Sequence, residues 1–193
     1  MPPHSLLPAD NLPPHVARLL AADLPPIGPG QPRHAFATVL EQADPSAWCG
    51  EASPQSPAAA CCVSGLWLWN GFLDRSHQIS QEIGSAEGSW WHGIMHRREP
   101  DAGNAAYWFR KVGDHPRFGS LAAAVRQHVA SRSLPTAGQW LATIKHWDPF
   151  QLIDLCEAAR RSPATNLRTL TQEVAALEWY ELFDHCRQQA AAG

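Results

Sequence analysis

The sequence predicts an all-α protein, an irregular helical bundle of six or seven helices with a Pro-rich N-terminal segment wrapped against it. Three observations predict this class. Apolar residues recur at helical spacing along most of the chain. Alternating runs of β-branched residues, which are typical of strands, are lacking. The 193 residues are 45% hydrophobic, which is enough to bury a core without a disulfide or a metal.

The first part of the chain differs in composition from the rest. Residues 1–57 are rich in Pro and Ala, and the prolines interrupt any long helix because they lack the amide donor. Two short helices fit between them, at residues 15–24 and 33–42. We therefore expect residues 1–57 to be an extension packed on a main helical domain of residues 58–193, without a core of its own.

The main domain begins with its longest helical candidate, residues 58–83. Residues 63–73 are apolar on nearly every side, so this segment is expected to be a buried central helix. After a glycine-bounded turn, a second helix covers residues 89–99 and ends before Pro100. Asp101 caps a helix over 102–112. The remaining helices are expected at residues 121–131, 149–161 and 166–190, with Asp148 and Pro149 starting the second of these.

A continuous helix over residues 58–83 would carry a polar row on one face. Asn70, Asp74, His77 and Gln81 fall on that row at helical spacing. Polar groups on a buried helix need partners, so the row predicts a facing polar site. A satisfied structural network would produce the same row, as would a helix that emerges into solvent after residue 73.

Two histidines on the next helix suggest metal binding. His92 and His96 are four residues apart, so their imidazoles share one face. With Asp74 as a carboxylate ligand they would form a two-His, one-carboxylate site for a divalent metal, Zn or Fe, and His77 is an alternative third ligand. Without a metal, His77 or His96 would serve as a catalytic general base. A bare pair at this spacing also arises by chance in a chain with ten histidines.

Arginines directly after this pair suggest a ligand with negative charge. Arg97 and Arg98 suit a carboxylate or phosphate, so a polar or anionic small molecule is the expected ligand. A structural ion pair to a nearby acid is an equally good interpretation. The other residues expected to line the pocket are Asn70, Trp91, Glu99, Asn104, Trp108 and Arg110.

The stretch WHGIMHRREPDAGNAAYWFR, residues 91–110, resembles a family of uncharacterised proteins. The pattern of that family reads roughly Trp-His-x-x-x-His-Arg-Arg-Glu, then Asp, Asn and Tyr-Trp-Phe-Arg. The resemblance extends to the preceding FLDRSHQIS and the later WDPFQLIDLCE, and it covers about residues 61–160. It implies no activity. It does imply that residues 74–115 act as a unit.

Charge and composition narrow the possible partners, the cellular compartment and the type of function. The net charge is -3 and the basic residues are scattered, so we expect no nucleic-acid partner. No apolar run is long enough to span a membrane, no secretory signal is evident, and the five cysteines contain no Cys-x-x-Cys pair, so we expect a cytoplasmic protein. Two functions stay open, a pocket-bearing enzyme or binding protein and a non-catalytic interaction module with a Trp-rich surface. The sequence indicates no oligomeric state.

Overall fold

The computed structural model describes residues 14–20, 23–42, 44–45 and 56–192, and these residues contain helices and no strand. The all-α prediction is therefore confirmed, with more helices than the six or seven expected. The α-helices are α1 (Pro14–Leu20), α2 (Ala37–Glu41), α3 (Pro57–Trp69), α4 (Leu73–Ser80), α5 (Ala86–Arg98), α6 (Ala102–Val112), α7 (Phe118–Val129), α8 (Pro149–Arg161) and α9 (Thr165–Ala192). Two 3-10 segments, η3 (His34–Phe36) and η5 (Thr136–Ala142), complete the set.

Side-chain caps fix where four helices of the main domain begin. The side chains of Ser56, Ser85, Asp101 and Asp148 accept hydrogen bonds from backbone amides in the first turns of α3, α5, α6 and α8. Each cap satisfies a donor that the helix itself cannot satisfy. The starts at Asp101 and Asp148 lie where the sequence places them.

The prediction of a single central helix over residues 58–83 is wrong. Helix α3 ends at Trp69 and α4 begins at Leu73. Between them Gly71 has φ +83°, and a Cβ there would lie 2.7 Å from the Gln31 carbonyl oxygen, so only glycine fits this turn. The two helices fold back on each other, and the Ser64 hydroxyl of α3 donates to the Ser76 carbonyl of α4 at 3.1 Å. The polar row predicted for one helix is thus divided between two.

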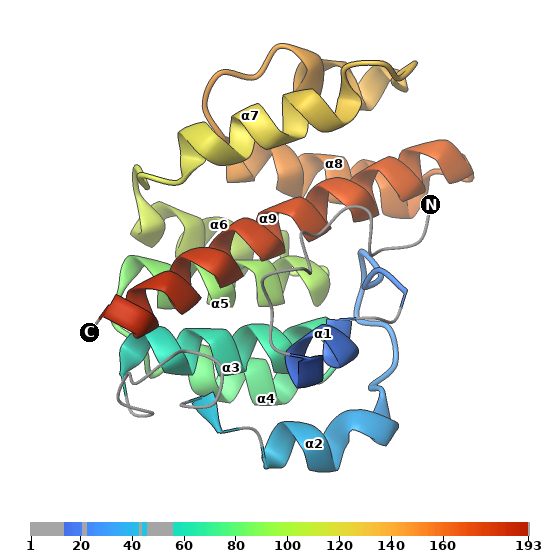
Figure 1. Ribbon diagram of the computed structural model, residues 1–193. Coiled ribbons are helices and arrows are strands. Elements are labelled where there is room, and N and C mark those ends of the chain that lie inside the picture. The colour runs from blue at the N-terminus through green and yellow to red at the C-terminus, as the bar shows by residue number, and fades with distance from the viewer. Residues whose placement is uncertain (1–13, 21–22, 43, 46–55, 193) are drawn as a thin grey trace.

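The long helix α9 organises the core. It runs across the bundle and packs against α3, α5, α7 and α8 (Figure 1). Large aromatic side chains fill the space between these helices, with Trp69, Trp90, Trp91 and Trp147 almost fully buried. The large hydrophobic side chains exposed among the described residues are Val39, Tyr107 and Phe150. No tryptophan is among them, so the described surface gives no support to a Trp-rich interaction face.

The N-terminal residues contact the bundle through apolar side chains of α1 and through backbone carbonyls that follow it. Helix α1 buries Val16, Leu19 and Leu20. Residues 25–29, which we call the strap, follow it and offer backbone carbonyls to side chains of the main domain. None of the helices in the described residues is long and apolar enough to cross a membrane. The four described cysteines are buried thiols, and Cys49 lies outside the described residues.

Candidate metal centre

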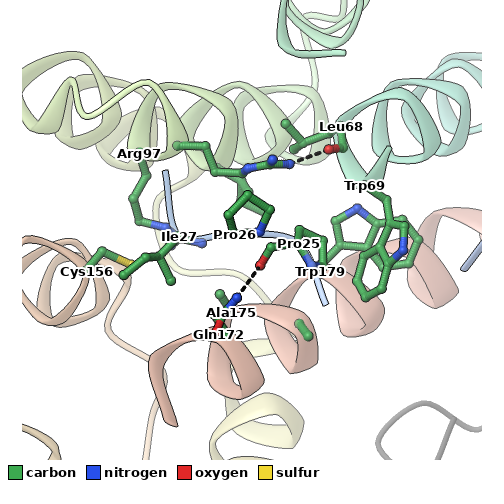
Figure 2. Close-up of a pocket in the computed structure, with 13 residues that line it drawn as sticks. Pro25, Pro26, Ile27, Leu68, Trp69, Arg97, Cys156, Gln172, Ala175 and Trp179 are labelled. Atoms are coloured by element: carbon green, nitrogen blue, oxygen red, sulfur yellow. Dashed lines mark hydrogen bonds between the residues drawn. The ribbon is translucent and has the colours of Figure 1, made fainter. Parts of the chain in front are cut away.

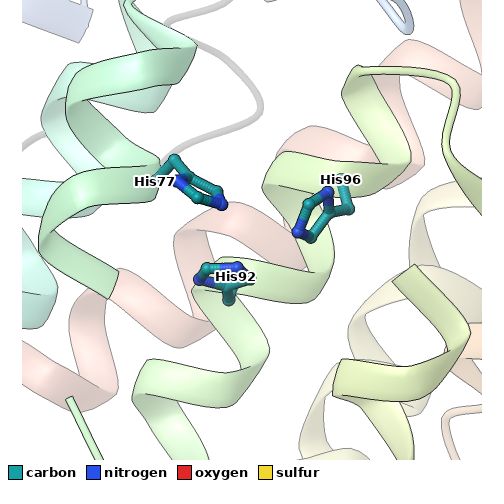
Figure 3. A group of neighbouring side chains, drawn as sticks. All are labelled: His77, His92 and His96. Carbon is teal, nitrogen blue, oxygen red and sulfur yellow. The ribbon is translucent and has the colours of Figure 1, made fainter. Parts of the chain in front are cut away.

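Three histidines converge where α4 meets α5. His77 comes from α4, and His92 and His96 come from successive turns of α5 (Figure 3). One ring nitrogen from each lies within 4.8 Å of the other two, and the ring centroids are 4.6–5.4 Å apart. The i,i+4 spacing puts the α5 pair on one face, and the packing of α4 on α5 adds the third ring. A metal ion with bonds near 2.1 Å would draw these nitrogens together by small side-chain rotations.

Ser80 sets the tautomer of His92. The Ser80 hydroxyl donates to the His77 carbonyl oxygen at 3.3 Å, and it lies 3.0 Å from His92 Nδ1. When the hydroxyl proton goes to that carbonyl, the hydroxyl accepts at the imidazole, and His92 Nδ1 carries the hydrogen. That tautomer leaves the lone pair of His92 on Nε2, one of the two ring nitrogens through which histidine binds metals.

Glu99 does the same for His96. A carboxylate oxygen of Glu99 lies 3.0 Å from His96 Nδ1. An ionised carboxylate only accepts hydrogen bonds, so His96 Nδ1 is the donor and Nε2 holds the lone pair. A carboxylate behind a histidine in this way orients the ring and raises its basicity toward a metal.

Burial keeps two histidines of this cluster, His92 and His96, uncharged. His92 is 2% exposed and His96 is 8% exposed. Burial, together with the nearby His96, His77 and Lys111, lowers the pKa of His92 to about 3. Burial also lowers the pKa of His96, against an opposing effect of Glu99. Both imidazoles are therefore neutral near pH 7, so protons compete little with a metal ion.

Asp74 lies outside this group of three. It is exposed in the first turn of α4, just after the Gly71 reversal that the sequence interpretation missed. It lines an open cleft of about 750 Å³ together with Arg75, Gln78, Glu99 and Asp101. The carboxylate expected to complete a two-His, one-carboxylate site is thus absent from the group, and His77 stands in its place.

Arg97 and Arg98 point into the core and not into the ligand pocket that the sequence predicts. Arg97 pairs with Glu178 of α9, both buried. Arg98 is also buried and donates to backbone carbonyls of Leu68 and of the strap. Neither is a member of the histidine group.

The other expected pocket residues are scattered. Asn70 is buried and bonds to the Leu66 carbonyl. Asn104 is exposed and bonds to Asp101, and Arg110 is also exposed. Trp91 packs in the core on Trp179. Of this set, Trp108 and Glu99 contact the histidine site, because the Trp108 ring lies 4.0 Å from that of His92 and Glu99 bonds to His96.

A second group of possible metal ligands, which the sequence interpretation missed, joins Glu87, His115 and His185. Glu87 Oε1 lies 3.4 Å from His115 Nε2 and 3.2 Å from His185 Nε2. His115 Nδ1 accepts from the Arg117 amide at 3.2 Å, so its hydrogen is on Nε2, where it faces the carboxylate. A metal at Nε2 would need the opposite tautomer. This group therefore fits a hydrogen-bonded carboxylate better than a metal ligand set.

The carboxylate of this second group gives a pH prediction. The His115 hydrogen bond lowers the pKa of Glu87 well below its usual value, which outweighs the effect of burial. A depressed carboxyl pKa stabilises the fold above the unfolded pKa of 4.5, and that stability is lost as the pH falls below it. The loss should reach at most about 1.4 kcal/mol per pH unit. Urea unfolding from pH 6 to pH 3 should show a shallower loss in Glu87→Gln than in the wild type, and parallel curves would contradict this.

Comparisons with family models, with curated proteins and with solved structures found no match for this chain. The structure shows a helical protein in which His/Glu groups could hold a metal ion.

Proposed function

We propose that this protein is a metal-dependent enzyme that holds one divalent ion, Zn²⁺ in preference to Fe²⁺, on His77, His92 and His96. The observation that carries the proposal is the convergence of three ring nitrogens within 4.8 Å, two of them on rings whose Nδ1 hydrogens already have acceptors. Neutral imidazole is a ligand that suits zinc. Two of the ligands sit on one rigid helix, so little order is lost on binding.

The number of ligands favours catalysis over a structural role. Structural zinc sites use four protein ligands, whereas catalytic sites use three and leave a position for water or substrate. Iron sites of the facial type need a carboxylate, and Asp74 is outside the group. A zinc ion held by three histidines would lower the pKa of a bound water toward neutrality and would polarise a bound oxygen.

A cleft beside the site supports a polar small-molecule substrate. The cleft of about 750 Å³ reaches Glu99, which is one hydrogen bond from His96. The cleft is open, and charged and amide side chains share its wall with Pro32, Phe72 and Leu73. In this proposal His77 and His96 are metal ligands, so their lone pairs are engaged and the general-base role expected for them falls to the metal-bound water.

Elemental analysis of protein purified without a His-tag tests the proposal. The expected result is close to one equivalent of zinc per chain, removed by a chelator and restored by titration. Cobalt(II) substitution should then give the visible spectrum of a four-coordinate ion. Chelated protein that takes up neither zinc nor cobalt at micromolar concentrations would overturn it.

Ser80, whose hydroxyl contacts His92 Nδ1, provides a second prediction for the site. Ser80→Ala removes the acceptor that holds the Nδ1 hydrogen of His92, so zinc affinity should fall by about 10–100-fold. Competition titration against a chromophoric chelator measures it. Ser76→Ala is the matched control, because Ser76 is also a buried serine of α4 but bonds to Ser64. Equal losses in the two variants would show that general packing is responsible and not the tautomer of His92.

A further inference from the structure

A separate, partly enclosed cavity lies beneath the strap. Pro25, Pro26 and Ile27 cover it, and α3, α5, α8 and α9 form its other walls (Figure 2). Its volume is about 30 Å³, which accommodates roughly two water-sized particles. The Gln172 side chain holds the strap at the Pro25 carbonyl at 3.3 Å, and Arg160 holds it at the Ile27 carbonyl at 2.8 Å.

Two hydrogen-bond donors in the wall of this cavity lack acceptors. Arg97 Nη1 and Trp69 Nε1 are both buried and neither has a hydrogen-bond partner. The two side chains are 2% and 1% exposed, and both line the cavity. A buried donor left without a partner costs about 1–3 kcal/mol, so a molecule that offers acceptors in the cavity would be stabilised there.

The charges around the cavity do not balance. Glu178 compensates Arg97. Arg98 lines the same cavity and is also buried, but its hydrogen bonds go to backbone carbonyls and it forms no ion pair with a described carboxylate. Burial lowers the pKa of Arg98 to about 9, with repulsion from Arg33 and Arg97, yet the group stays charged at pH 7. One buried positive charge therefore has no carboxylate partner in the part of the chain that the structure describes.

We infer that this cavity binds a small monovalent anion, a halide or an ion the size of formate, against Arg97, Arg98 and the indole N–H of Trp69. Size excludes larger anions, since the cavity has room for about two water-sized particles. A water molecule would accept from the two free donors but would leave the excess charge uncompensated. The site is distinct from the histidine cluster, so this inference does not depend on the proposed metal.

Thermal unfolding of the full-length protein at constant ionic strength tests it, with chloride and formate as probes. Gluconate, which is too large for the cavity, makes up the ionic strength. A specific site raises the melting temperature along a saturating curve, whereas general salt effects do not saturate. Saturation with chloride but not formate would identify a halide site, and saturation with both would identify a site for either ion. A wild-type melting temperature that responds to neither probe overturns the inference.

Trp69→Phe isolates the indole donor without a change in charge. The apparent anion affinity should fall by about tenfold, as expected for one hydrogen bond to a charged group. Trp140→Phe is the matched control, because Trp140 is a half-buried tryptophan that does not line the cavity. Equal affinity in wild type and Trp69→Phe would overturn the assignment. Should Trp69→Phe fail to fold, a bromide-soaked wild-type crystal decides the question, because the site requires an anomalous peak in contact with Arg97.

Discussion

Zinc affinity should fall on the order of 1,000-fold when His92 is replaced by asparagine, if the histidine cluster is the metal site. Structural zinc sites bind with about 10–16 kcal/mol shared among four ligands. One ligand therefore contributes about 2.5–4 kcal/mol, which corresponds to roughly two to three orders of magnitude at about 1.4 kcal/mol for each factor of ten. His92 is the most buried ligand of the three and belongs to the rigid pair on α5.

Competition titration of chelated protein measures this loss, and the zinc-induced rise in melting temperature should disappear with it. His128→Asn is the matched control, because His128 is also a helical histidine with a side-chain hydrogen-bond partner but lies on α7, outside the cluster. His77→Gln serves as a second ligand variant at a less buried position. Zinc affinity that is unchanged in both ligand variants would rule out the cluster as the metal site.

Local patterns in the sequence were sufficient for part of this site. The spacing of His92 and His96 places both rings on one face of any helix, whatever surrounds it. Asp101 and Asp148 start helices because a short acceptor side chain satisfies the free amides of the first turn. These features depend on neighbours within four residues along the chain. The all-α class follows from the same short-range periodicity.

His77 joins the site because the chain reverses at Gly71, and hydrophobic periodicity does not reveal this reversal. Residues 63–73 have a near-continuous apolar pattern, which fits one long helix as well as two helices joined at a glycine. The positive φ of Gly71 reverses the chain, and this reversal brings α4 back along α3. His77 then faces His92 and His96, while Asp74 stays at the exposed start of α4.

The arginines show a different limit of sequence interpretation. Arg97 and Arg98 follow His96 directly, so proximity in sequence placed them in the same predicted pocket. On α5, consecutive residues point in directions about 100° apart, and Arg97 faces the core. Its partner Glu178 is 81 residues further along the chain, and no local pattern connects the two. The sequence interpretation had considered only acids close to these arginines.

Breaking the buried ion pair between Arg97 and Glu178 should cause the largest loss of stability that we expect. Glu178→Gln should destabilise the fold by about 3–5 kcal/mol, because it leaves the Arg97 charge buried without a counterion. The Glu178 carboxylate accepts hydrogen bonds from the indole N–H groups of Trp90 and Trp147, at 3.3 and 3.0 Å. Glutamine keeps an oxygen that can accept from these donors. The substitution therefore removes the charge and little of the packing. Chemical denaturation at pH 7 measures the change.

A surface pair and a double variant separate the buried charge from other effects of the substitution. Glu157→Gln breaks a partly exposed pair with Arg160 and Arg161 and should cost no more than about 1 kcal/mol. Adding Arg97→Met to Glu178→Gln removes the uncompensated charge, so the double variant should recover most of the lost stability. If the double variant were less stable than Glu178→Gln alone, packing of the Arg97 side chain on Phe109 would outweigh its charge. Recovery would show that the Arg97 charge requires a negative partner in the core, and Glu178 is that partner.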